Sequence, residues 1–406
     1  MTTMDLPGGW HLHPIGLIAI PKLGGNYRNS STPSGRPLIK MGNIARVNID
    51  LKRLEYIPNN EKVLPEHCLH YGDVLFNTRN TLDLVGKVSI WRDELPTAYY
   101  NSNILRLEFK DEYCGSSSYF GYALNSKSSI EAIRALATGT TSVAAVYTRD
   151  LLKLQILVPP KPEQVYIASA LTDIDNLINA LEHLIATKQA IKQGMMQQLL
   201  TGRTRLPKFA GEWKRAQLST VGVVVTGGTP PTRDRSNYGW DHMFVSPADL
   251  GRSKNVTTTE KMLSKSGFAR TRRIPAGSTL FVCIGSTIGK VGLAAEDLAT
   301  NQQINSIIPS DGIDPDYLYY AANTLSSVVR EQAGAQAVPL VNKSQFSAFE
   351  ILLPTLPEQR AIAEVLSDAD AQIAQLRAKL DKATSMKTGM MQELLTGRTR
   401  LSEQRP

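Results

Sequence analysis

The sequence predicts a mixed α/β (α+β) fold in which two similar domains of strands and helices are each followed by a long helix. A stretch that begins Pro-Glu-Gln occurs twice, at 162–206 and 357–401, and the two copies align without a gap. Both copies place apolar residues in alternating steps of four and three, which is typical of one face of a long helix. Because the segments before the two copies also share short motifs, we interpret the chain as one duplicated unit with an internal pseudo-two-fold arrangement.

We divide the chain into four stretches: a mixed domain at 1–155, a helical stretch at 156–206, a second mixed domain at 207–350 and a second helical stretch at 351–406. Strand-like runs separated by Gly, Asn, Ser and Pro occur in both mixed domains. These runs are Asp73–Phe76, Val88–Trp91, Ile104–Phe109, Ser278–Ile284 and Ile304–Ile308.

Short motifs pair the two mixed domains. The pairs are Gly8-Gly9-Trp10 with Gly211-Glu212-Trp213, Gly24-Gly25-Asn26 with Gly227-Gly228-Thr229, Gly72–Phe76 with Gly277–Phe281, and Gly86-Lys87-Val88 with Gly289-Lys290-Val291. Between these motifs the two domains diverge and need insertions to align. We therefore expect a common scaffold with different surface loops, and such loops are where recognition residues usually lie.

The two long helices have recognisable ends. Pro162 and Pro357 suit a first helical position, where the missing N–H is not needed. Gly202 and Gly397 follow Leu-Leu-Thr and suit a C-terminal cap. The helices between them have just under forty residues, which corresponds to a length of about 57 Å.

Each helix has one apolar stripe and therefore needs a partner, which we expect to be the other copy. In the first helix the stripe consists of Ile167, Leu171, Ile174, Ile178, Leu181 and Ile185. In the second helix it consists of Ile362, Leu366, Ala369, Ile373, Leu376 and Leu380.

Composition narrows the class of protein only slightly. The net charge of +8 is compatible with a polyanionic partner, but such an excess also occurs in proteins that bind none. Cys68, Cys114 and Cys283 form no Cys-x-x-Cys pair, which favours structural thiols in a reducing compartment. No signal-peptide pattern occurs and no stretch approaches eighteen apolar residues, so we expect a cytoplasmic protein without membrane contact.

The order of these features resembles the specificity subunit of type I restriction-modification systems (HsdS-like). The resemblance covers essentially the whole chain. Its most specific parts are the two Pro-Glu-Gln starts with their heptads and the two Leu-Leu-Thr-Gly-Arg-Thr-Arg-Leu endings, together with Thr226–Pro230, Gly285–Lys290 and Asn301–Gln303 in the second variable domain. The first variable domain departs from the pattern, because Leu23–Asn26 and Tyr100–Asn103 stand where Thr-Gly-Gly-Thr-Pro and Asn-Gln-Gln would fall.

The resemblance implies that each variable domain is a target recognition domain that reads one half of a split double-stranded DNA sequence. The two long helices would pack antiparallel and hold the domains apart. Two methyltransferase subunits would dock near the ends and supply S-adenosylmethionine, and restriction/translocase subunits that use ATP and Mg would join for cleavage. The chain itself would be noncatalytic, with no cofactor and no metal of its own.

DNA reading requires polar side chains at base edges and basic or amide groups at phosphates. In the first domain the candidates are Asn26, Arg28, Lys40, Arg79, Asn80, Lys87, Asn101 and Asn103. In the second they are Thr226, Gly227, Gly228, Thr229, Arg233, Arg235, Ser286, Lys290, Asn301, Gln302, Gln303 and Lys343. A further basic group could face phosphates or only solvent: Arg252, Lys254, Lys261, Lys265, Arg270, Arg272 and Arg273.

Two other classes of protein stay open. A self-contained nuclease or methyltransferase would need catalytic motifs, and the adenine methyltransferase signature does not occur. The run Gly285–Lys290 approaches a phosphate-binding loop, but it has three residues instead of four between its glycines and then Val291. A noncatalytic coiled-coil scaffold with protein-binding variable domains would share every feature of the helices. The arginines that recur at both helix ends could pair with DNA, with a partner subunit or with the helix dipole: Arg203, Arg205, Arg398 and Arg400.

Overall fold

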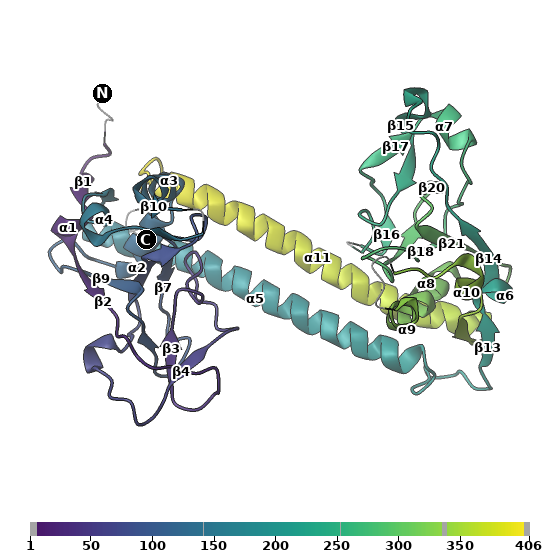
Figure 1. Cartoon of the computed structure of the whole chain (residues 1–406), viewed down its shortest axis with the longest axis horizontal. Helices are drawn as coiled ribbons and strands as arrows, with labels where there is room; N and C mark the ends of the chain where they lie inside the picture. The colour runs from purple at the N-terminus through teal and green to yellow at the C-terminus, as the bar shows by residue number, and fades with distance from the viewer. Residues whose placement is uncertain (1–5, 141, 252, 335–338, 402–406) are drawn as a thin grey trace, which may run out of the picture. The chain divides into compact units, whose positions relative to one another are not determined.

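Figure 1 shows the computed structural model of the chain, which describes residues 6–140, 142–251, 253–334 and 339–401. The chain forms two compact units. Unit 1 consists of residues 1–180 and 379–406, and unit 2 consists of residues 181–378. Each unit therefore combines one mixed domain with the start of one long helix and the end of the other.

Unit 1 is built on a four-stranded antiparallel sheet in the order β2-β9-β5-β7. These strands are β2 (Ala19–Leu23), β9 (Ile104–Phe109), β5 (Val74–Asn77) and β7 (Val88–Ile90). A smaller sheet has the order β4-β3-β8, and its strands are β4 (Glu55–Ile57), β3 (Arg36–Ile39) and β8 (Tyr99–Tyr100). The remaining strands are β1 (His11–Pro14) with β12 (Gln155–Val158), and β10 (Thr138–Gly139), β11 (Ala144–Ala145) and β6 (Arg79–Asn80). The short helices are α1 (Ile15–Ile18), η1 (Pro65–His67), α2 (Ser117–Leu124), α3 (Lys127–Leu136) and α4 (Thr148–Leu151).

Unit 2 repeats this strand order, which is the structural counterpart of the sequence duplication. Its main sheet has the order β14-β21-β18-β19-β16, with β14 (Gly222–Thr226), β21 (Ile304–Pro309), β18 (Thr279–Val282), β19 (Val291–Ala294) and β16 (Asn255–Val256). Its smaller sheet has the order β17-β15-β20, with β17 (Lys261–Leu263), β15 (Tyr238–Val245) and β20 (Ala299–Thr300). A third pair joins β13 (Lys214–Gln217) to β22 (Glu350–Leu353). The short helices are α6 (Leu218–Val221), η2 (Arg235–Asn237), α7 (Lys265–Ala269), α8 (Pro315–Thr324), α9 (Ser326–Ala333) and α10 (Lys343–Ser347).

The strands predicted from apolar runs are all present. They correspond to β5, β7, β9, β18 and β21; β5, β9, β18 and β21 are central in the two main sheets, and β7 is an edge strand. Every residue of β5, β7 and β18 is buried, because helices cover one face of the main sheet and the smaller sheet adjoins it. A strand that is buried on both faces reads as a continuous apolar run, which explains why sequence alone could find it.

The two long helices are α5 (Lys161–Leu199) and α11 (Leu356–Leu394), each of 39 residues. In unit 1 the start of α5 and the end of α11 enter one core, where Ile167 and Leu171 share a cluster with Leu394 and Leu395. In unit 2 the end of α5 and the start of α11 enter one core, where Leu199 shares a cluster with Ile362 and Leu366. The two helices therefore pack together antiparallel. This arrangement confirms the predicted fold. The predicted stripe faces inward, since its residues in the first helix and in the second are buried or half-buried: Ile167, Leu171, Ile174, Ile178, Leu181, Ile185, Ile362, Leu366, Ala369, Ile373, Leu376 and Leu380.

The predicted glycine caps are confirmed as well. Gly202 and Gly397 have φ angles of 68° and 71°, in the left-handed region that favours glycine. A Cβ atom on Gly397 would lie 2.5 Å from the Pro7 side chain and 3.3 Å from Trp10. The second glycine is therefore needed for space as well as for backbone conformation.

Candidate nucleic-acid interface

The paired glycines of each domain lie against the turn that follows a short strand of the smaller sheet. In unit 2 the Gly227 N–H donates to Ile304 O at 3.0 Å and the Gly228 N–H donates to Thr300 O at 2.8 Å. In unit 1 the N–H groups of Gly24 and Gly25 donate in the same way to Ile104 O and Tyr100 O, at 3.2 and 3.0 Å. We call the glycine loop and the turn that it contacts the loop frame. Both domains share this frame, although their sequences differ there.

This frame explains the first glycine of each pair. A Cβ atom on Gly227 would lie 2.2 Å from Asn301 O, and a Cβ atom on Gly24 would lie 2.2 Å from Tyr100 O. The space around Gly227 is therefore taken by the protein itself. Gly228 has no atom within 4 Å of a Cβ position, so of the two candidates only Gly228 offers an open side to a ligand.

Five candidate residues of unit 2 come together at this frame. Thr229 Oγ1 donates to Gln302 Oε1 at 2.7 Å, and Thr226 Oγ1 donates to Asn305 Oδ1 at 2.7 Å. Asn301 holds the turn, because its side chain accepts from the Gln303 N–H and donates to Gln303 Oε1, both at 3.0 Å. Thr229 and Gln302 are exposed. Their hydroxyl and amide groups are of the kind that read base edges in the major groove.

The corresponding turn of unit 1 has the same backbone bonds with other side chains. Asn101 Oδ1 accepts from the Asn103 N–H at 3.2 Å, as Asn301 does from Gln303. The Asn101 N–H donates to Ile39 O at 3.1 Å, and the Asn301 N–H donates to Val245 O at 3.0 Å. Asn26, which follows the glycines of unit 1, is exposed. The sequence departure of the first domain therefore changes the groups displayed and leaves the frame intact.

The remaining candidates divide into engaged and open side chains. Lys40 Nζ bonds Glu55 at 2.9 Å, and Lys290 Nζ donates to Pro247 O at 3.2 Å, so both are used inside the fold. Asn80 Oδ1 accepts from the Thr81 N–H at 2.8 Å, and Lys87 is half-buried beside β7. The exposed candidates are Arg28, Arg79, Arg233, Arg235, Ser286 and Lys343. Arg252 of the proposed basic group lies outside the described residues.

The terminal arginines pair with the glutamates of the Pro-Glu-Gln motifs. In unit 1 the Arg400 guanidinium donates to Glu163 at 2.7 and 2.8 Å, and the Trp10 indole N–H donates to the same carboxylate at 3.0 Å. The hydrogen bond from Glu163 raises the pKa of the Arg400 guanidinium. Arg400 follows the end of α11 and Glu163 lies at the start of α5, so this contact fastens one helix to the other.

Unit 2 contains the same contact with the helices exchanged. Arg205 donates to Glu358 at 2.6 and 2.8 Å, and the Trp213 indole N–H donates to Glu358 at 3.1 Å. Neither DNA nor a partner subunit is needed to account for Arg205 and Arg400. Arg203 and Arg398 are exposed, and Arg398 lies 3.7 Å from Glu393.

A second polar contact joins each mixed domain to the helices. In unit 1 Asp175 accepts from the Tyr122 hydroxyl at 2.7 Å and pairs with Lys387 and Arg92. In unit 2 Asp370 accepts from the Tyr320 hydroxyl at 2.7 Å and pairs with Lys192. Burial raises the pKa of both tyrosine hydroxyls, so they remain hydrogen-bond donors. Sequence analysis missed these residues, although each helix residue recurs at the same position of both copies.

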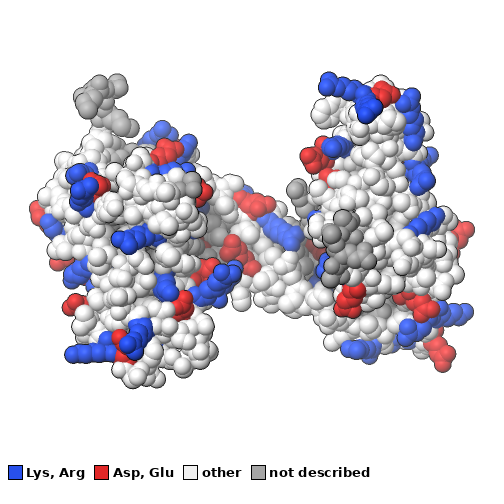
Figure 2. All heavy atoms as spheres, in the orientation of Figure 1, with Lys and Arg blue, Asp and Glu red and all other residues white. Residues whose placement is uncertain are grey.

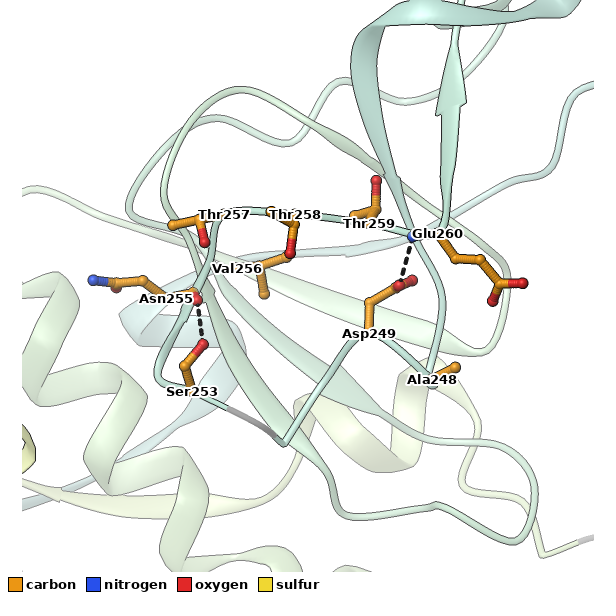
Figure 3. Close-up of a pocket in the computed structure, with 9 residues that line it drawn as sticks. All are labelled: Ala248, Asp249, Ser253, Asn255, Val256, Thr257, Thr258, Thr259 and Glu260. Carbon is orange, nitrogen blue, oxygen red and sulfur yellow. Dashed lines mark hydrogen bonds between the residues drawn. The ribbon is translucent and has the colours of Figure 1, made fainter. Parts of the chain in front are cut away.

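The loop between β15 and β17 contains a polar recess, shown in Figure 3. Of its two acidic side chains, Asp249 is already used, because it accepts from the Ser246 and Glu260 N–H groups at 2.8 and 2.9 Å. Ser253 Oγ likewise donates to Asn255 O at 2.7 Å. The recess is therefore held by its own hydrogen bonds. No helix among the described residues is long and apolar enough to cross a membrane.

Two α/β domains of one topology, each with the same loop frame and each fastened to paired long helices, define an internally duplicated recognition protein. The family model for the type I restriction modification DNA specificity domain matches residues 27–193 and 210–384, and the chain belongs to this family. The family consists of noncatalytic recognition subunits, so the chain is not an enzyme.

Individual relatives agree with this assignment. A Methanocaldococcus jannaschii protein described as the putative type I restriction enzyme MjaX specificity subunit is 22% identical over 98% of this chain and 95% of its own length. The HindI specificity subunit of Haemophilus influenzae is 33% identical over 35% of this chain and 32% of its own. Among solved structures, the S subunit of a type I restriction-modification system from M. genitalium has a TM-score of 0.68 at 15% identity and covers 97% of both chains.

Proposed function

We propose that the chain reads an asymmetric, split DNA sequence, with one half-site for each mixed domain. The observation that carries this proposal is the shared loop frame with different exposed side chains. The frame displays Thr229 and Gln302 in unit 2 and Asn26 in unit 1. Different donors and acceptors on one scaffold select different bases, so the two half-sites should differ.

Basic side chains on both units support contact with the phosphate backbone. Arg28 and Arg79 in unit 1 and Arg233, Arg235 and Lys343 in unit 2 are exposed, and within the described residues their side chains make no hydrogen bond or ion pair. Figure 2 shows Lys and Arg side chains spread over the visible face of each unit. Such contacts fix the register of a protein on DNA, whereas the loop frame would supply the sequence information.

The long helices would set the unread spacer between the half-sites. A helix of 39 residues is about 58 Å long. Half-sites read from one face of B-DNA lie about 34 to 36 Å apart. Two helices fastened at both ends by Glu163 with Arg400 and by Glu358 with Arg205 are suited to such a task, because neither can slide along the other.

The catalytic steps would belong to partner subunits. We propose two methyltransferase subunits, which bring S-adenosylmethionine, and restriction/translocase subunits, which bring ATP and Mg. In support, a chain from a structure on complex assembly and conformational transition of the type I restriction-modification system has a TM-score of 0.56 and covers 98% of this chain. We expect the assembly to work in the cytoplasm, where the DNA is.

The proposal is tested by co-expressing the chain with a type I methyltransferase subunit from the same genome and mapping methylated adenines on host DNA by single-molecule sequencing. We expect one motif with two unequal halves and a spacer of fixed length. A complex that assembles but methylates no split motif would contradict DNA reading and favour a protein-binding scaffold. A motif with two identical halves would contradict the assignment of a different half-site to each domain.

A further inference from the structure

Strand β15 contains a bulge that displays a tryptophan. Its pairing with β17 shifts so that both Tyr238 and His242 lie opposite Leu263, which leaves residues 239–241 looped out. Trp240, at the centre of this bulge, is 90% exposed. Trp10 and Trp91 are buried and Trp213 is half-buried. Bulges commonly redirect a side chain for a function, and such exposure removes nearly all the burial that usually stabilises a tryptophan.

Hydrogen bonds and close packing hold the residues on either side of the bulge in place. Asn237 is buried, and its side chain donates to Pro231 O at 3.0 Å and accepts from Arg270 at 3.2 Å. Helix α7 packs closely on this residue, since a Cβ atom on Gly267 would lie 1.9 Å from Asn237 O. The rings of His242 and Phe268 stack with centroids 4.0 Å apart. Trp240 is thus held on a fixed support, which lowers the entropy lost when it binds a partner.

Open basic side chains lie on the segments that adjoin β15 in sequence or pair with it. We call Trp240, Arg233, Arg235, Lys261 and Lys265 the β15 arm surface. The four cations are exposed, and within the described residues their side chains make no hydrogen bond or ion pair. Lys265 is next to the bulge, because its N–H donates to Asp241 Oδ2 at 3.2 Å.

The neighbouring acidic groups balance only part of this charge. Asp234 is paired with Arg270 at 2.9 Å, which leaves Asp241 and the exposed Glu260 beside the four cations. Figure 2 shows Lys and Arg gathered at the end of unit 2 that β15, β17 and α7 form in Figure 1. An exposed aromatic ring beside an excess of cations matches DNA, which offers apolar sugar surfaces next to phosphates.

The arm surface is connected to the loop frame. Arg272, which follows α7, donates to Thr226 O at the start of the glycine loop, and the Tyr238 hydroxyl donates to Pro230 O at 3.4 Å. Unit 1 carries a small polar residue at the equivalent position. When β15 and β3 are aligned by their parallel pairing with β20 and β8, Ser34 corresponds to Trp240.

We propose that the β15 arm surface is an additional duplex-DNA contact of unit 2, in which the Trp240 indole packs on the deoxyribose of one nucleotide beside the half-site and the four cations contact phosphates. This inference rests on the proposed function. It makes the binding asymmetric, because only unit 2 has this contact. Removal of the ring should weaken binding roughly tenfold, as expected for the loss of one well-packed aromatic contact.

The test compares wild-type protein, Trp240→Ala and Trp240→Phe, each assembled with the methyltransferase subunits. The probes are a labelled duplex that carries the methylated motif with its natural flanks and a scrambled duplex of the same composition, and binding is followed by fluorescence anisotropy. We expect Trp240→Ala to bind both duplexes roughly tenfold more weakly and Trp240→Phe to retain most of the affinity. Tyr71→Ala, which removes an aromatic side chain that is 65% exposed in unit 1, serves as the matched control and should bind as wild type.

Acrylamide quenching of tryptophan fluorescence gives a second readout. Trp240 is the most exposed of the four tryptophans of this chain, so the difference in quenching between wild type and Trp240→Phe isolates its signal. This difference should shrink when DNA binds. Unchanged affinity of Trp240→Ala overturns the inference, as does failure of this variant to assemble with the methyltransferase, which would make the surface a protein contact. If the wild-type complex itself shows no preference for the motif, the proposed function fails instead.

Discussion

Glu163 and Glu358 show how a single buried side chain can organise the junction of two helices. Their carboxylates are 5% and 2% exposed, and each accepts from one arginine and one indole. An ion pair of this kind contributes little net stability compared with apolar packing, but its disruption is costly because charged and polar groups are then left without partners. The glutamates therefore favour the arrangement in which the start of each long helix lies beside the end of the other.

Replacement of Glu358 by Ala should lower the free energy of unfolding by about 3 kcal/mol, since Arg205 and Trp213 both lose their acceptor. Glu163→Ala should cost less, because Arg400 is 41% exposed whereas Arg205 is 27% exposed. Chemical denaturation of the purified variants measures both values. Glu364→Gln, an exposed change on the same helix, should stay within about 0.5 kcal/mol of wild type. Equal losses for all three variants would contradict the role given to the buried pairs.

Gly227 and Gly228 provide a matched pair of substitutions in the loop frame. Gly227→Ala should destabilise the protein by about 2 kcal/mol and impair DNA binding, because the new methyl group would meet Asn301 O and Thr300 Oγ1 at 2.2 Å. Gly228→Ala meets no atom within 4 Å and should fold as wild type. Thermal unfolding together with DNA binding by the assembled complex separates the two. A stable Gly227→Ala variant with wild-type binding would mean that the close approach is not required.

At the scale of elements, the long helices follow from local pattern alone. Their heptads, proline starts and glycine caps all lie within one stretch of sequence, so periodicity and end signals were sufficient to predict them. The same holds for β5 and β18, which are continuous apolar runs. The bulge at Trp240 could not be predicted, because it depends on the pairing of β15 with β17 and no local signal marks a register shift.

Insertion of one heptad at the middle of both α5 and α11 should lengthen the spacer without altering the bases read. Seven residues add about 10 Å of helix, which is about three base pairs of B-DNA. Insertion of a single residue in each helix is the control, since it rotates the apolar stripe away from its partner and should destabilise the protein. Methylated motifs of the variant complexes give the spacer length directly. An unchanged spacer in a folded heptad variant would show that the helices do not set it.

Polar contacts between elements that are far apart in the chain could not be predicted from the sequence. Arg400 and Glu163 are far apart in the chain, and nothing in either motif states that they meet. A signal nevertheless existed, because Trp, Pro-Glu-Gln and the arginine-rich ending recur in both copies although helix formation does not require them. Sequence motifs supplied the candidate residues, whereas the separation of engaged Lys40 and Lys290 from open Arg233 and Arg235 required the structure.

For the whole molecule, duplication has a direct consequence. Each compact unit contains a mixed domain, the start of one helix and the end of the other, so neither half of the sequence contains a complete unit. The two units share strand order, loop frame and buried glutamate contacts, yet display different groups. Such a protein can treat two unlike half-sites in equivalent ways, which a protein of two identical subunits cannot do.

The central claim is that each unit reads its own half-site, and methylation mapping of loop variants tests it most directly. Thr229→Ala combined with Gln302→Ala should relax or abolish selection at one half of the methylated motif, and Asn26→Ala should do so at the other half. In both variants the unaffected half and the spacer should stay as in wild type. If either variant alters both halves, or if both variants alter the same half, the assignment of one half-site to each unit is wrong.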